Sequence, residues 1–138
     1  MGKINLTLGD TVRFSKTFAE CDVYLFAGMT GDFSPNHINE EFCKTTPFKT
    51  RIVQGCLTFG LTSTVAALSA AKTGQTCLSV GYDRVRFLKP VHFGDTITAV
   101  YTVTDIDEER MRFTASCDLF DQHGDKVLVC THIQKVLD

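Results

Sequence analysis

One stretch of this chain can form a long buried helix, and the segments after it have the pattern of strands. In residues 55–71, apolar side chains at helical spacing predict a single buried face, formed by Leu57, Leu61, Val65, Leu68 and Ala71. Gly74 then gives the expected helix stop. A single apolar helix cannot bury itself, so the remaining elements have to cover it.

The segments after the helix supply that cover. Residues rich in Val, Ile, Thr and aromatics predict strands at 76–87, 96–107, 111–120 and 127–136, of which the last three are joined by short polar turns. Such strands form an antiparallel meander. Before the helix, residues 10–18 predict another strand and 19–30 a short helix. We therefore predict one α+β domain over residues 1–138, with an antiparallel sheet wrapped around a long central helix.

Charge and cysteine usage exclude several classes of function. The net charge is −2 and no run of Lys or Arg occurs, so neither nucleic acid nor an anionic membrane is an expected partner. No targeting segment is visible, and the polar residues in 52–71 indicate a core helix, not a membrane span. The six cysteines form no CxxC pair, so we expect no metal site and free thiols in a reducing, cytoplasmic setting.

Two titratable residues flank a turn at residues 31–37. Asp32 and His37 lie five positions apart, and Pro35 between them restricts the backbone. A carboxylate and an imidazole that converge on one water can remove a proton from it and deliver a proton elsewhere. Hydration of a conjugated thioester needs both steps. The alternative interpretation is an Asx-turn at a helix end with an exposed histidine.

Gly55 stands where the apolar helix begins. Backbone N–H groups there have no helical acceptor and carry the positive end of the helix dipole. Without a side chain, Gly55 lets a ligand oxygen approach its N–H, as an oxyanion of a thioester enolate would require. A glycine that only eases the turn into the helix is the alternative.

Further along, the basic residues Arg84, Arg86 and Lys89 have two interpretations. They either contact the phosphates of a substrate carrier or form an exposed polar strand face.

Three motifs in this order resemble the MaoC-like, (R)-specific enoyl-CoA hydratases. Residues 26–39 (FAGMTGDFSPNHIN) are similar to the hydratase motif of that family. Residues 52–57 (IVQGCL) are similar to the start of its central helix. Residues 85–91 (VRFLKPV), with 94–96 (GDT), resemble a strand-turn-strand that is shared more widely among hot-dog proteins. The likeness covers nearly the whole chain.

The resemblance implies a hot-dog fold, a homodimer paired through its sheets, and an acyl-CoA or acyl-carrier-protein thioester as substrate, with no cofactor. It makes Asp32 and His37 the catalytic pair and the Gly55 N–H the oxyanion donor. The expected substrate-binding residues are Gln54, Cys56 and Ser63. For Ser63, a hydroxyl bonded back to its own helix is the alternative, and for Cys56 a buried, unreactive thiol.

The chain departs from the family pattern at two positions. Ser34 stands where the family usually has Asn before the proline, and Gln54 stands where a histidine is common before the glycine. Two other functions stay open beside the hydratase. A hot-dog thioesterase usually carries its acid on the central helix, yet no Asp or Glu lies between Gly55 and Lys72. A non-catalytic module that binds acyl thioesters is the other.

Overall fold

A computed structural model describes residues 2–138 of the chain. The chain begins with strand β1 (Thr11–Thr17), helix α1 (Glu20–Thr30) and two single-turn helices, α2 (Pro35–Ile38) and α3 (Glu40–Cys43). Two consecutive helices follow, α4 (Gly55–Phe59) and α5 (Leu61–Thr73). The second half contains β2 (Cys77–Phe87), β3 (Thr96–Asp107), β4 (Arg112–Phe120) and β5 (Lys126–Val136). The predicted elements are all present, with bounds shifted by a residue or two.

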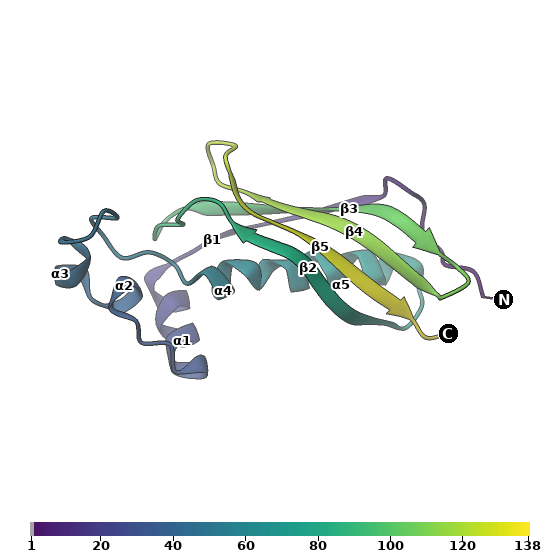
Figure 1. Cartoon of the computed structure of the whole chain (residues 1–138), viewed down its shortest axis with the longest axis horizontal. Coiled ribbons are helices and arrows are strands. Elements are labelled where there is room, and N and C mark those ends of the chain that lie inside the picture. The colour runs from purple at the N-terminus through teal and green to yellow at the C-terminus, as the bar shows by residue number, and fades with distance from the viewer. Residues whose placement is uncertain (1) are drawn as a thin grey trace.

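The five strands form one antiparallel sheet in the order β1-β3-β4-β5-β2. The predicted meander is the β3-β4-β5 part, and β1 and β2 extend it at the two edges. In Figure 1 the sheet curves over α5, and both termini lie at the end opposite α1, α2 and α3. This is the α+β arrangement predicted from the sequence, with a sheet wrapped around a central helix.

The central helix is divided into two parts at Gly60. This residue ends α4 and lies next to the start of α5, and its own N–H donates to the carbonyl oxygens of Cys56 and Leu57. No helix in residues 2–138 is long and apolar enough to span a membrane. A sequence rich in Gly, Ala, Ser and Thr lets the backbone of this helix approach the sheet closely.

The predicted buried face of the central helix was partly wrong. Leu61 and Val65 are buried as expected, but Leu68 is 42% exposed and Ala71 is also exposed. The face that meets the sheet is instead completed by small residues, namely Thr62, Ala66, Ser69 and Thr73. Small side chains face the sheet because the two layers lie close together, and Leu68 points away from it.

The sheet buries alternate residues against the helix. Along β3 the buried side chains are Ile97, Ala99, Tyr101 and Val103, and β4 repeats the pattern with Phe113, Ala115, Cys117 and Leu119. All six cysteines are free. Cys43, Cys117 and Cys130 are buried as expected, but Cys21 and Cys56 are exposed, so the interpretation of Cys56 as a buried thiol was wrong.

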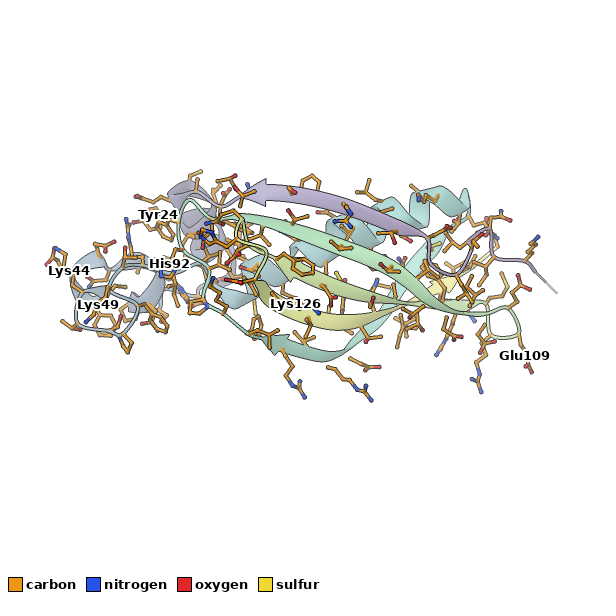
Figure 2. All side chains as sticks on the ribbon, turned by 90° about the horizontal axis from the view of Figure 1, so that it is seen from above. Tyr24, Lys44, Lys49, His92, Glu109 and Lys126 are labelled. Atoms are coloured by element: carbon orange, nitrogen blue, oxygen red, sulfur yellow. The ribbon has the colours of Figure 1, made fainter. Side chains whose placement is uncertain are left out.

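Helices α1, α2 and α3 project beyond one end of the sheet. Figure 2 shows Tyr24, Lys44 and Lys49 at this end and Glu109 at the opposite end. Arg51 connects the projecting helices, because its guanidinium is ion-paired with Glu20 of α1 at 3.3 Å and with Glu40 of α3 at 2.9 Å. The projecting part is therefore tied together by charge as well as by packing.

A buried polar cluster crosses the core between the sheet and α5. His132 of β5 is fully buried, and its Nδ1 and Nε2 lie 2.7 Å from the Tyr101 hydroxyl and the Ser79 hydroxyl, respectively. Gln134 donates from Nε2 to the Tyr101 oxygen at 3.1 Å and to the carbonyl oxygen of Ala66 at 3.0 Å. Tyr82 stacks on the His132 ring with a centroid separation of 4.2 Å.

Burial of His132 predicts an acid-sensitive contribution to stability. Desolvation lowers the pKa of His132 from 6.5 to about 4. Above pH 6.5 the imidazole is neutral in both the folded and the unfolded chain. Between pH 6.5 and 4 only the unfolded chain takes up the proton, so the free energy of unfolding falls as the pH falls, by about 3 kcal/mol from this group.

Denaturant titrations of the wild-type chain and His132→Gln at pH 7, 5.5 and 4 measure the contribution of His132 to the free energy of unfolding. We expect the stability advantage of the wild type to shrink by about 3 kcal/mol over that range. A difference that stays constant with pH would contradict the assignment of His132 as a buried neutral imidazole.

Two threonines of the central helix lead to opposite predictions. Thr62 donates to the Phe59 carbonyl oxygen at 2.8 Å, whereas the buried Thr58 hydroxyl has no hydrogen-bond partner among the described residues. An unpaired buried hydroxyl costs stability, and an isosteric methyl group does not. We expect Thr58→Val to raise the free energy of unfolding by about 1 kcal/mol and Thr62→Val to lower it by about the same amount. Equal destabilisation in denaturant titrations of the two variants would contradict this account.

Candidate active site

The turn after α1 holds Asp32. The helix ends at Gly31, which adopts the left-handed conformation (φ 82°) and donates its N–H to the Ala27 carbonyl oxygen at 2.8 Å. The Asp32 carboxylate then accepts a hydrogen bond from the Ser34 N–H through Oδ1 at 3.2 Å. That contact is an Asx-turn, so the local geometry of the alternative interpretation is present. Ser34 contributes its backbone N–H to this turn, and its side chain makes no capping hydrogen bond to α2.

His37 is held at the other end of the same turn. Pro35 begins α2, and His37 follows two residues later on that helix. Its Nδ1 lies 2.8 Å from the Ile52 carbonyl oxygen. A carbonyl only accepts, so Nδ1 carries the proton of the neutral ring and Nε2 has a free lone pair. This Nε2 lies 3.9 Å from Asp32 Oδ2.

The separation of Nε2 and Oδ2 suits a shared water. At 3.9 Å the two atoms are too far apart for a direct hydrogen bond. A water beside them is within hydrogen-bonding reach of both atoms at once. The side chain of His37 is 13% exposed and that of Asp32 is 43% exposed, so solvent reaches the pair from the Asp32 side. The structure thus brings together the two residues that the sequence singled out.

Gly55 begins α4, as the sequence predicted. Its N–H lies in the first turn, where no helical acceptor exists. A Cβ on Gly55 would lie 2.8 Å from the ring of Phe87, so a larger residue here would displace that exposed ring. The end of β2 therefore lies directly against the first residue of the helix.

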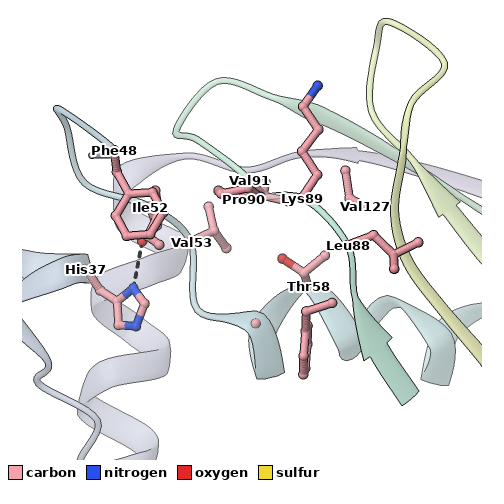
Figure 3. A pocket seen from close by; sticks show the side chains of 12 residues that line it. His37, Phe48, Ile52, Val53, Thr58, Leu88, Lys89, Pro90, Val91 and Val127 are labelled. Atoms are coloured by element: carbon pink, nitrogen blue, oxygen red, sulfur yellow. Dashed lines mark hydrogen bonds between the residues drawn. The ribbon is translucent and has the colours of Figure 1, made fainter. Parts of the chain in front are cut away.

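His37 and Gly55 line one cavity of about 280 Å³. Its walls are mostly apolar and include Phe48, Ile52, Val53, Phe87, Leu88, Pro90 and Val91. Figure 3 shows His37 and Thr58 among these side chains, with the His37–Ile52 hydrogen bond drawn as a dashed line. An apolar cavity with a few polar groups at its edge is typical of a small-molecule site.

The other predicted site residues lie elsewhere. Ser63 lines a second cavity of about 640 Å³ beside α5. Gln54 is buried and donates from Nε2 to the Val23 carbonyl oxygen at 2.9 Å, so its amide supports α1 and lines neither cavity. Cys56 is exposed and also lines neither. Only Gly55 among the four central-helix candidates shares a cavity with His37.

The basic residues of the β2–β3 region have different surroundings. Lys89 lines the first cavity, but its ammonium group is ion-paired with Asp121 at 2.7 Å and Asp125 at 2.8 Å, and these two carboxylates raise its pKa. Arg84 and Arg86 are exposed. No group of three His, Cys, Asp or Glu side chains within residues 2–138 is arranged to hold a metal ion.

Two members of the site were not predicted from the sequence. Ile52 contributes to the site through its backbone, because its carbonyl oxygen holds His37. Its position is fixed in turn by α2, since the Ile52 N–H donates to the Asn36 carbonyl oxygen at 3.0 Å. No pattern of side chains in the sequence predicts a role that depends on a backbone carbonyl. Thr58 follows Gly55 by three residues, and this spacing places both on one helix face. That spacing is the signal that would have identified Thr58.

Comparison with known proteins is consistent with this geometry. The model of the MaoC like domain matches residues 4–119. The (R)-specific enoyl-CoA hydratase of Rhodospirillum rubrum is 40% identical over 111 residues, which cover 79% of this chain and 75% of that protein. The 3-hydroxybutyryl-CoA dehydratase of Methylorubrum extorquens is 34% identical over 125 residues, covering 91% and 76%, respectively.

A solved structure supports the same assignment. The (R)-hydratase from A. caviae involved in PHA biosynthesis superimposes with a TM-score of 0.88 at 30% sequence identity, covering 96% of this chain and 98% of that one. The central helix wrapped by an antiparallel sheet is therefore the hot-dog fold. The family model covers most of the chain, and the fold agrees with it. The chain belongs to the MaoC-like family.

Proposed function

We propose that this protein catalyses the reversible hydration of trans-2-enoyl thioesters to (R)-3-hydroxyacyl thioesters. The observation that carries the proposal is the position of His37, whose Nδ1 is fixed by Ile52 and whose Nε2 faces Asp32 Oδ2 at 3.9 Å. The names of the relatives support this reaction, because they include (R)-specific enoyl-CoA hydratases and a 3-hydroxybutyryl-CoA dehydratase.

In the proposed reaction, the Asp32 carboxylate and His37 Nε2 hold one water. As the water oxygen bonds to Cβ of the substrate, Nε2 accepts a proton from it and the C=C electron pair moves toward the thioester carbonyl. The same proton is then delivered to Cα. The net change is the addition of one water, and dehydration follows the reverse path.

Gly55 stabilises the charge that develops on the carbonyl oxygen. Its N–H at the start of α4 donates to the enolate oxygen, and the positive end of the helix dipole adds to that interaction. The apolar walls of the cavity strengthen both effects because they exclude water. The substrate carbonyl itself is the electron sink, so the proposed reaction uses no cofactor.

The two alternative functions are less well supported. A hot-dog thioesterase usually carries its catalytic acid on the central helix, and the sequence from Gly55 to Lys72 contains no Asp or Glu. A non-catalytic module would not need His37 fixed with a free Nε2 opposite a carboxylate. Release of free thiol from acyl-CoA would favour the thioesterase. Tight binding of acyl-CoA without turnover would favour the non-catalytic module.

Removal of either catalytic group tests the proposal. We expect Asp32→Asn and His37→Gln each to lower kcat on crotonyl-CoA by about 10²–10⁴-fold, since His37→Gln removes the base that accepts the proton and Asp32→Asn removes the carboxylate that holds the water. Loss of the conjugated enoyl-thioester absorbance measures the rate. His123→Gln is the matched control, because His123 is an exposed histidine in the β4–β5 turn, and it should keep the wild-type rate. Folded Asp32 and His37 variants with wild-type rates would refute the assignment.

We further infer that the working form is a cytoplasmic homodimer. Strand β2 lies at a sheet edge, and its side chains Leu78 and Val80 are exposed. An eleven-residue edge with exposed apolar side chains favours pairing with a second strand, and a second β2 would continue the sheet.

Six free thiols support a reducing compartment. Coenzyme A and carrier-protein thioesters share the same phosphopantetheine, and both belong in the assay.

The dimer predicts a specific effect at the β2 edge. Leu78→Lys places a positive charge on each of the two facing edges, and these charges repel each other. We therefore expect the mass measured by analytical ultracentrifugation to fall from that of two chains toward that of one chain. Leu25→Lys on α1 is the control, since Leu25 is 64% exposed and Leu78 is 59% exposed. A wild-type chain that sediments as a monomer, or equal effects of the two substitutions, would rule out this interface.

A further inference from the structure

The second cavity carries polar groups that the proposed reaction does not use. This cavity of about 640 Å³ begins at Phe59, the residue after Thr58 of the first cavity, and continues beside α5. Its floor is formed by small residues of α5, and its polar members are Thr62, Ser63, Gln75, Ser79, Tyr82, His132 and Gln134. A plain hydrocarbon chain would gain nothing from these groups.

The hydrogen bonds of the buried polar cluster have a fixed direction. The Tyr101 oxygen accepts from Gln134 Nε2, so the Tyr101 hydroxyl proton needs an acceptor of its own. Tyr101 is fully buried, and among the described residues the acceptor within reach is His132 Nδ1 at 2.7 Å. His132 is neutral because burial lowers its pKa to about 4. Its single ring proton therefore resides on Nε2.

This direction leaves one donor at the end of the chain of hydrogen bonds. Nε2 of His132 donates to the Ser79 oxygen at 2.7 Å. The Ser79 hydroxyl proton has no acceptor among the described residues, and Ser79 is exposed and lines the second cavity. The cluster thus presents an oriented O–H donor to whatever enters. It does not activate Ser79 as a nucleophile, because the imidazole donates to that oxygen.

The charge of the lining restricts the ligand further. Its described members include no Lys or Arg, and His132 is neutral. A carboxylate placed there would lose its water without gaining a cation, at considerable cost. A hydroxyl or carbonyl oxygen accepts the Ser79 hydrogen bond without that cost. The lining therefore fits a neutral oxygen group.

We propose that the second cavity receives the far end of the acyl group, and that the acyl group carries a neutral oxygen acceptor, a hydroxyl or a carbonyl, bound by Ser79. This inference rests on the proposed hydratase function. Gly55 and Thr62 are seven residues apart along α4 and α5, which corresponds to roughly 10 Å of helix. The oxygen group accordingly lies several carbons beyond the double bond, in an acyl chain of medium length.

Three substrates with eight acyl carbons test the proposal: trans-2-octenoyl-CoA, its 8-hydroxy derivative and trans-2-octenedioyl-CoA, in which C8 is a carboxylate. We expect the hydroxy compound to have a kcat/KM about fivefold above the plain chain, as one neutral hydrogen bond provides, and the carboxylate to be the poorest. Ser79→Ala should abolish the hydroxy preference. Ser79→Thr should restore it, and Ser15→Ala, an exposed serine on the other edge strand, should not alter it.

The outcomes separate this inference from the hydratase proposal. Turnover of crotonyl-CoA and of the plain chain without a Ser79-dependent preference, or a preference for the carboxylate, would overturn the inference alone. No turnover of any enoyl thioester would overturn both. Nitrogen chemical shifts of His132 give a readout independent of activity, with the proton expected on Nε2. A proton on Nδ1 would reverse the hydrogen bonds and overturn the inference.

Discussion

The hydrogen bonds of residues 51–55 connect the projecting helices to the central helix and the sheet. Ile52 bonds to α2 through its N–H and to His37 through its carbonyl oxygen. Val53 donates its N–H to the Val91 carbonyl oxygen at 2.8 Å, and Gln54 reaches α1 through its side chain. Gly55 then begins α4. A shift of this segment would therefore move the histidine and the oxyanion donor together.

This arrangement explains how a small domain keeps a catalytic pair in place outside its core. Asp32 and His37 lie on a short turn and a single-turn helix, and such elements have little stability of their own. Arg51 adds ion pairs to α1 and α3 on the far side of the same segment. Because the partners of the segment come from both the helices and the sheet, the imidazole keeps one tautomer and one direction.

Local patterns in the sequence predicted the elements well because each pattern reports burial on one face. The alternation in β3 and β4 and the Pro35 turn are of this kind. The face of α5 was partly mispredicted, because hydrophobicity alone favours Leu68 over Ser69, whereas a closely approaching sheet requires the smaller residue. Hydrophobic spacing carries no information about the distance between layers.

The contacts that orient the site depend on residues distant in the sequence. His37 meets Ile52 fifteen positions away, and His132 meets Ser79 across 53 positions. No local motif encodes such pairs, and nothing in the sequence around His132 distinguishes it from an ordinary strand residue. Gln54 shows the same limit, because only the fold reveals that its amide faces Val23.

The most direct test of the account is the stereochemistry of the product that the purified wild-type chain forms from crotonyl-CoA. We expect rapid loss of the enoyl absorbance and formation of (R)-3-hydroxybutyryl-CoA. One water held on one side of the substrate by Asp32 and His37 gives a single enantiomer, and the relatives include (R)-specific hydratases. Formation of the (S) product, or release of free thiol in place of hydration, would contradict it.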